Sequence, residues 1–377
     1  MERLKKILKV LLITAVSVAV LLYGGVFLGH KLIFPVKTSN VPTVAAVTNG
    51  RFTFGAQAHM PQPTDAGEYV AVLAEQLKQY NQIAPEIWPG NSLADQSLIV
   101  NEIRSGRFWL IGPGGDVKPL TKAEASNSEG LRLTIAGEDI TNYSVFEREL
   151  QLGTYDAFIA FVQKGFRSAE QSKWQTTDNI PNLDHNEFLD NIPARAKRDL
   201  LERQLLKAVS EPGNRQLILD ALATYNDWKS EFQGDYKSSV YDDRIEGTAY
   251  YFELVSCLYS AYPDQVKNGA DLDQALSLLA TRDDVYVKHG LIAEGGIIGG
   301  FACVLLDRLD SGWKEKLMND PVATPMELLS SNFSSMDLPA PEQVTTAETD
   351  AVAAAIRAPI ENKGIALFFK YVYDRLY

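Results

Sequence analysis

The sequence predicts an α+β protein that is predominantly helical and carries an N-terminal transmembrane helix. Three observations lead to this prediction. The segment Val10–Leu28 is apolar and carries no charged residue. Two segments rich in apolar and β-branched residues, Ser97–Glu102 and Arg107–Gly112, have the character of strands. From about residue 150 onward, long stretches repeat their apolar residues with the period of a helix.

The composition bounds the kind of protein and its partners. The chain has 377 residues, of which 46% are hydrophobic and 22% charged, as in folded globular proteins. Its formal net charge of −12 argues against nucleic acid as a partner, because a phosphate backbone selects basic surfaces. Cys257 and Cys303 lie in apolar surroundings and are predicted to be buried, and the sequence leaves a disulfide between them open.

Val10–Leu28 is predicted to be a single, uncleaved membrane-spanning helix, because about 20 apolar residues cross a bilayer. Basic residues precede it: Arg3, Lys5, Lys6 and Lys9. The positive-inside bias therefore keeps the N-terminus cytoplasmic and places the remaining chain outside the cell membrane. A cleaved secretory signal is the alternative. Such a signal has a shorter apolar region and ends at a small-x-small site, which Phe27-Leu28-Gly29-His30 does not resemble.

The chain is predicted to divide into four segments. These are a cytoplasmic stub and anchor at 1–31, a stalk at 32–63, a small α+β subdomain at 64–149 and a helical domain at 150–377. After the first predicted helix, near residues 69–83, the expected helices cover 154–167, 191–210, 214–231, 241–262, 272–279, 290–309 and 363–377. A segment rich in Pro, Ser and Thr, 324–348, is predicted to be a connecting loop.

Two glycine-rich segments are predicted to be structural. Gly112–Asp116 lacks the Lys-Ser/Thr ending of a phosphate-binding loop and is predicted to be a hairpin turn. Gly295–Gly300 lies within a predicted helix, and its small residues would let that helix pack closely against a neighbour.

The predicted helix that begins at Tyr241 carries acids on one face. Glu246, Ala249, Tyr250 and Glu253 follow the spacing i, i+3, i+4 and i+7, which places them together. Acids on a buried face need a metal, a cation or hydrogen bonds to offset their desolvation. The candidate polar cluster on this helix comprises Asp243, Arg244, Glu246, Tyr250 and Glu253.

A second helix, predicted at Thr154–Gln163, suggests what such acids once did. In a zinc-peptidase His-Glu-x-x-His helix, two imidazoles bind the metal and the Glu is the general base. Tyr155, Asp156 and Ile159 occupy these three positions. Together with the run Glu246-Gly247-Thr248-Ala249-Tyr250, this helix resembles those of gluzincin zinc peptidases. The resemblance covers roughly residues 87–313 and implies that the helical domain is peptidase-like.

The same resemblance implies that zinc and catalysis are lost. The family pattern would make Glu246 the third zinc ligand, but a phenol at Tyr155 and an alkyl group at Ile159 replace both imidazoles. We therefore expect neither a catalytic residue nor a cofactor, with Tyr155, Asp156, Ile159 and Glu246 as vestigial positions. Without zinc, Glu246 needs another partner, such as Arg244 or Tyr155.

Three functions stay open from the sequence. The first is a non-catalytic, peptidase-like binding domain outside the membrane, whose partner is a peptide, a wall polymer or a protein. The second is an active zinc metallohydrolase with unusual ligands, with His185, Glu187 and Glu246 as metal candidates and Asp156, Asp184 and Glu253 as further donors. The third is a membrane protein of an unrelated fold.

Overall fold

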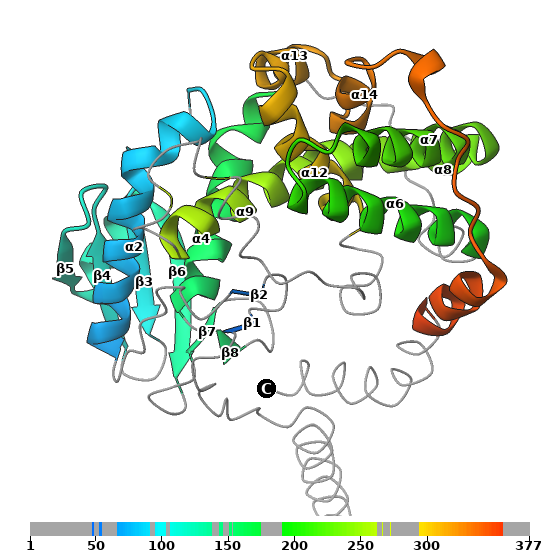
Figure 1. The fold of residues 1–377 in the computed structure, drawn as a ribbon. Helices are drawn as coiled ribbons and strands as arrows, with labels where there is room; N and C mark the ends of the chain where they lie inside the picture. Colours follow the sequence, from blue (N-terminus) through cyan, green and yellow to red (C-terminus); the bar gives the residue numbers. More distant parts are fainter. Residues whose placement is uncertain are drawn as a thin grey trace, which may run out of the picture. The chain divides into compact units, whose positions relative to one another are not determined.

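The computed structural model describes residues 47–48, 53–54, 66–90, 95–102, 106–137, 143–145, 151–152, 154–174, 191–261, 266, 272 and 294–356. These residues form a predominantly helical α+β structure, as the sequence predicts (Figure 1). The predicted transmembrane segment and C-terminal helix lie outside them, as does most of the stalk, of which β1 (Val47–Thr48) and β2 (Thr53–Phe54) are described. Within the described part, no helix has the length and apolar character needed to cross a membrane.

A mixed sheet forms the β part. Its order is β5-β4-β3-β6-β7-β8, and only β3 and β6 run parallel among its neighbouring strands. Leu98, Ile99 and Val100 of the central strand β3 are all buried, as expected for a strand covered on both faces. The bounds are β3 (Leu98–Glu102), β4 (Arg107–Ile111), β5 (Val117–Leu120), β6 (Leu131–Gly137), β7 (Tyr143–Val145) and β8 (Gln151–Leu152), with α3 (Lys122–Asn127) between β5 and β6.

The predicted hairpin turn at Gly112–Asp116 is confirmed. It joins the antiparallel strands β4 and β5, and the amide of Gly112 donates to the carbonyl of Asp116 over 2.9 Å. Gly115 has a φ of 82°, which favours glycine because it has no Cβ. A Cβ there would also lie 3.0 Å from the Cβ of Lys78, so the turn meets a neighbouring helix closely.

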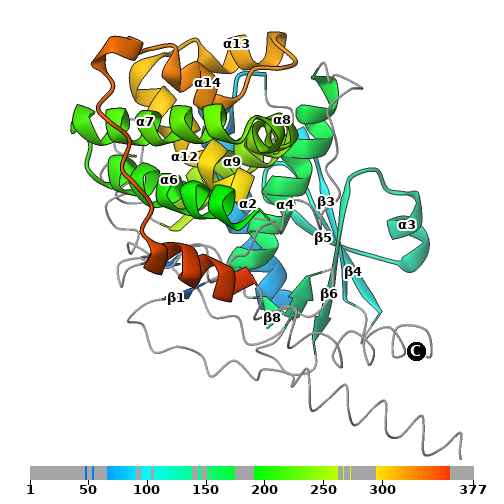
Figure 2. The same cartoon turned by 90° about the vertical axis from the view of Figure 1, so that its right-hand side faces the viewer.

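Two helices, α2 (Ala66–Ile87) and α4 (Thr154–Ala169), pack side by side against the sheet (Figures 1 and 2). In α2, Tyr69, Leu73 and Tyr80 are spaced four and seven residues apart, which places them on one face of the helix. All three are buried. The α2 and α4 helices both contact a third helix, α9 (Gly247–Ala261). The pair therefore forms a layer between the sheet and the helical part.

The helical part is built around α12 (Glu294–Leu309), which contacts α6, α9 and α14 (Figure 1). Its residues from Glu294 to Leu306 are all buried. A helix that is buried all round is apolar on every side, which explains the run of small and aliphatic residues. The remaining elements are α6 (Ile192–Ser210), α7 (Arg215–Glu231), α8 (Gln233–Tyr241), α13 (Trp313–Asn319), α14 (Pro325–Ser330) and η6 (Ser335–Asp337).

Several local features differ from the predicted elements, among them the helices α3, α8 and α13, which were not predicted. The predicted helix from Tyr241 is interrupted at its start by η3 (Asp242–Glu246), a π-helical turn between α8 and α9. Such turns often occur at functional sites and shift the faces of the residues around them. The predicted loop at 324–348 contains α14, where Thr324 caps the helix by accepting a bond from the amide of Glu327.

The predicted close packing of Gly295–Gly300 is confirmed. A Cβ on Gly299 would collide with the carbonyl oxygen of Asp243, and one on Gly247 would lie 2.6 Å from the Cα of Gly299. A Cβ on Gly295 would lie 2.7 Å from the Cβ of Asp242. The backbones of α12 and of η3 and α9 thus approach one another without side chains between them.

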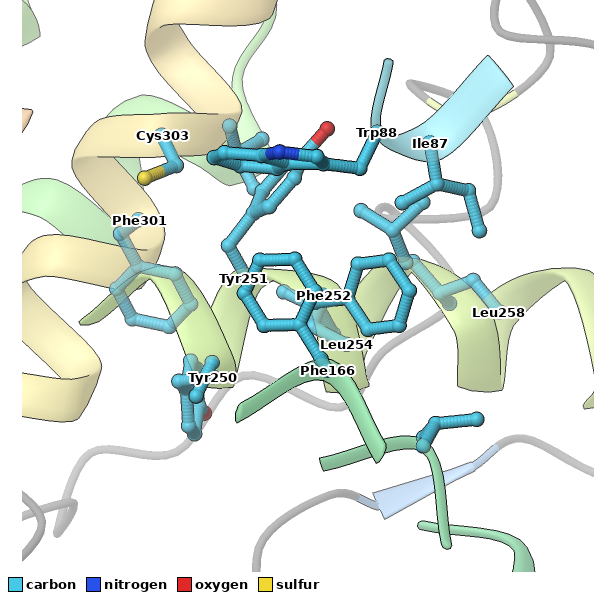
Figure 3. Packing of buried hydrophobic residues seen from close by; sticks show 14 of the residues in the cluster. Ile87, Trp88, Phe166, Tyr250, Tyr251, Phe252, Leu254, Leu258, Phe301 and Cys303 are labelled. Carbon is cyan, nitrogen blue, oxygen red and sulfur yellow. The ribbon is translucent and has the colours of Figure 1, made fainter. Parts of the chain in front are cut away.

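Aromatic side chains of α4, α9 and α12, such as Phe166, Phe252 and Phe301, lie in the core near Trp88 (Figure 3). Phe166 stacks on Phe252, with ring centroids 4.3 Å apart. Trp88 stacks on Trp174 and meets Trp313 edge to face, at centroid distances of 5.4 and 5.5 Å. Cys303 is a buried, free thiol, whereas the side chain of Cys257 lies outside the described part.

Candidate functional site

The two acids predicted to share a face of the helix both meet α4. Glu246 is half-buried, and its Oε2 forms an ion pair with the guanidinium of Arg167. Glu253 is buried, and its Oε2 accepts a hydrogen bond of 3.1 Å from Nε2 of Gln163. The later acid thus pairs with the earlier residue of α4, so α4 and α9 run antiparallel. Of the predicted face, Glu246 and Glu253 both contact α4.

The partner of Glu246 is at the opposite end of α4 from the positions that resemble a zinc-binding helix. Tyr155 and Arg167 are 167 − 155 = 12 residues apart on α4, which corresponds to about 18 Å of rise. The side chains of Tyr155, Asp156 and Ile159 lie outside the described part. The structure therefore brings the two helices together, with Glu246 beside the C-terminal end of α4.

The residues around Glu246 do not fit a zinc ion. A carboxylate binds zinc through an oxygen lone pair, and Oε2 of Glu246 instead faces the positive guanidinium of Arg167. That charge would repel a divalent cation at the same carboxylate. Among the residues that the structure describes, no three His, Cys, Asp or Glu side chains are grouped so as to hold a metal. His185, Asp184 and Glu187 lie outside those residues.

Asp243 belongs to a buried charge network between α6, α8, η3 and α12. Nη1 and Nη2 of Arg198 bind the two oxygens of Asp243 over 2.8 and 2.5 Å, which is the bidentate geometry of an arginine–carboxylate pair. Nε of Arg198 and Nη1 of Arg195 both donate to Oε1 of Glu294, over 2.6 and 2.5 Å. Arg195 also pairs with Asp235. The network ties four elements together.

The sequence suggested Arg244 as a partner of Glu246, but Arg244 contacts other groups. Its Nη1 donates to the carbonyl oxygens of Asp320 and Ala323, over 2.6 and 2.8 Å. Its guanidinium lies over the ring of Trp174, 5.3 Å from the centroid. Burial lowers the pKa of Arg244 to about 10, against an opposing effect of Asp320.

The predicted polar cluster is therefore distributed among several partners. Glu246 and Glu253 face α4, Asp243 faces α6, and Arg244 faces the segment after α13. Tyr250 is buried and meets Phe301 of α12 edge to face, with centroids 6.0 Å apart. Successive residues of a helix point in directions about 100° apart, so neighbouring members of the cluster face different elements.

Sequence reasoning missed the basic residues that hold these acids. Two of these residues, Arg195 and Arg198, share one face of α6 with the acid Glu202. The three follow the spacing i, i+3 and i+7. That face is buried. Charges at helical spacing beside the apolar residues Leu201 and Leu205 were the available signal, but such a pattern is equally typical of a solvated helix face.

Comparison with known proteins adds no relative to this description. No protein-family model, no curated protein sequence and no solved structure matches the chain. The interpretation of the site therefore depends on its own residues.

Proposed function

We propose that the chain is a membrane-anchored, extracytoplasmic binding protein whose peptidase-like helices maintain the fold and catalyse no reaction. The predicted anchor, Val10–Leu28, would hold the N-terminus in the cytoplasm and the bulk of the chain outside. The observation that carries the proposal is the ion pair between Arg167 and Glu246. It occupies the carboxylate that the family pattern would assign to the metal.

The contacts of the other acids support the same proposal. Asp243 is held by Arg198, and Glu253 accepts from Gln163. Each of these contacts joins an acid of η3 or α9 to a different helix, so each stabilises the packing of helices. A catalytic base needs access to a substrate proton, whereas Asp243 and Glu253 are both buried. The binding partner would be a peptide, a wall polymer or a protein outside the membrane.

Metal content and peptidase activity of the full chain test this proposal. The protein would be purified in detergent, its zinc measured by mass spectrometry, and its cleavage of a mixed peptide library followed with and without a chelator. We expect zinc well below one equivalent and no chelator-sensitive cleavage, in the wild type and in Glu246→Gln. Arg167→Gln is the matched variant, because it removes the cation from the same pair.

One outcome would overturn the proposal. It is stoichiometric zinc together with chelator-sensitive cleavage that Glu246→Gln abolishes and Arg167→Gln preserves. In that case Glu246 would be a metal ligand, and the protein would be a metallohydrolase with unusual ligands.

A further inference from the structure

Arg244 differs from the other fully buried arginines of the described part. Arg195, Arg198 and Arg244 are 0, 1 and 1% exposed, respectively. The first two bind carboxylates, whereas Arg244 donates to backbone carbonyls, which neutralise no charge. Its Nε and Nη2 are buried and have no hydrogen-bond partner in the part of the chain that the structure describes. The structure thus encloses a guanidinium with one edge unused.

An unpaired, buried guanidinium is costly. A buried charge is ordinarily paired, because the interior replaces water with a medium of low polarity. Unused donors add their own desolvation penalty. The Nε–Nη2 edge of an arginine presents two parallel N–H bonds, which match the two oxygens of a carboxylate. The free edge of Arg244 therefore has the geometry that receives an anion.

The indole groups beside Arg244 offer further donors. Trp174, whose ring contacts the guanidinium, has a buried Nε1 without a partner. Trp88, which stacks on Trp174, also has a buried and unpartnered Nε1. Buried indole N–H groups usually find an acceptor. A positive charge with unused donors of its own and of its stacking neighbour selects a ligand that supplies oxygen acceptors and a negative charge.

Gln171, which is held against the backbone of η3, carries one unused acceptor. Nε2 of Gln171 donates to the carbonyl of Ile245 over 2.7 Å and to Oγ1 of Thr248 over 2.8 Å. These bonds fix the amide beside η3, and its Oε1 is buried without a partner. It could accept a hydrogen bond from an N–H group of a ligand. A carboxylate next to an amide N–H, as in the last residue of a peptide, would use both kinds of group.

We propose that Arg244 anchors a carboxylate-bearing ligand, such as a peptide with a free C-terminus, in a site formed with Trp174 and Gln171. A carboxylate is favoured over phosphate because one guanidinium neutralises one negative charge, and the nearby acid Asp320 would repel the second charge of phosphate. Since Trp174 covers the guanidinium, binding moves this indole. The inference rests on the proposed function as a binding protein and names its ligand class.

The experiment compares two peptides that differ only in their terminal charge. Full-length protein in detergent would be titrated with N-acetyl-alanyl-alanine and with its C-terminal amide, and inorganic phosphate would be a third probe. Tryptophan fluorescence reports movement of the indoles, and the melting temperature reports binding to the folded state. We expect saturable binding of the free acid, and binding of the amide at least about tenfold weaker, as for loss of a charge-assisted pair.

Two variants test the role of the arginine. Arg244→Lys keeps the positive charge and a donor for the carbonyls of Asp320 and Ala323, but it lacks the bidentate edge. We expect it to keep the fold, checked by circular dichroism, and to bind the free acid about tenfold more weakly. Arg308→Lys is the matched control, because Arg308 also donates to two backbone carbonyls, those of Ala208 and Val209. It should bind the free acid as the wild type does.

Several results would overturn the inference. Equal binding of acid and amide by the wild type would do so while leaving a peptide-binding function in place. Binding of neither peptide, or of phosphate alone, would also overturn it. The comparison of the free acid with the amide uses wild-type protein, so it does not depend on whether any variant folds. Chelator-sensitive cleavage would contradict the proposed function, so the two failures are distinguishable.

Discussion

Glu202 on α6 is a buried carboxyl group that has no hydrogen-bond partner among the described residues. Its side chain is 1% exposed, and both oxygens are unpartnered. Burial raises its pKa well above the ordinary value of 4.5, and the charges of Glu294 and Asp199 raise it further. Arg198 and Arg195 oppose this effect because they attract the ionised form, but they are engaged by Asp243, Asp235 and Glu294. Glu202 therefore favours its neutral form.

The raised pKa of Glu202 predicts how stability changes with pH. The unfolded chain loses this proton near pH 4.5, whereas the folded chain keeps it to a higher pH. The stabilising contribution is thus fully present below pH 4.5 and is lost as pH rises toward the folded-state pKa. In Glu202→Gln this loss is absent. We expect its stability relative to the wild type to increase by up to about 1.4 kcal/mol per pH unit above pH 4.5.

Urea unfolding of both proteins at a series of pH values checks this prediction. Glu315→Gln is the control, because Glu315 is an exposed acid on α13. The free energy of unfolding of Glu315→Gln, plotted against pH, should run parallel to that of the wild type. A parallel curve for Glu202→Gln as well would show that the folded and unfolded states hold this proton equally.

At the scale of elements, glycines decide how closely α12 approaches η3 and α9. Gly299 lies where a Cβ would collide with the carbonyl of Asp243. Gly296, three residues earlier on the same helix, has room, since the nearest atom to a Cβ there is the carbonyl oxygen of Glu246 at 3.7 Å. The two positions therefore separate the effect of a collision from the effect of helix propensity.

Gly299→Ala should destabilise the protein by about 1–3 kcal/mol, because an added methyl group would force the two backbones apart. Gly296→Ala should be neutral or stabilising by up to about 1 kcal/mol, because alanine has the higher helix propensity and finds space. Thermal unfolding of both variants under one condition makes the comparison. Equal losses of stability in the two variants would contradict the collision that we infer at Gly299.

At the scale of the whole molecule, ionic contacts connect helices that are distant in the sequence. Arg167 and Glu246 are 79 residues apart, and Arg195 and Glu294 are 99 residues apart. The Arg195–Glu294 pair is fully buried, so removal of one partner would leave an uncompensated charge at a cost of about 3–5 kcal/mol. The partly exposed Arg167–Glu246 pair contributes less. These contacts join α4 to η3 and α6 to α12.

The predicted anchor and orientation can be tested in cells. We expect the full chain to remain in the membrane fraction after an alkaline carbonate wash, because a spanning helix resists extraction. In bacterial spheroplasts, protease added from outside should digest the segment after residue 31. A chain that lacks residues 1–31 is the control and should leave the membrane. Release of the full chain by carbonate, or its protection from protease, would contradict the prediction.

The sequence predicted the elements whose signals are local. The β4–β5 hairpin follows from Gly112–Asp116, because a turn depends on the residues within it. Most of the predicted helices in the described part, such as 191–210 and 214–231, follow from apolar periodicity. The close contact of Gly295–Gly300 was predictable because only small residues permit it. The resemblance to gluzincin peptidases stays a prediction.

The sequence by itself determined that acids would line one face of the helix after Tyr241 and that they would need partners. Only the tertiary structure decided which partners these are. Arg167 binds Glu246, and Arg244 turns instead toward the carbonyls of Asp320 and Ala323. The physical reason is that an ion pair depends on distance in space, and chain segments far apart in the sequence meet only after the helices pack. The unused edge of Arg244 became visible for the same reason.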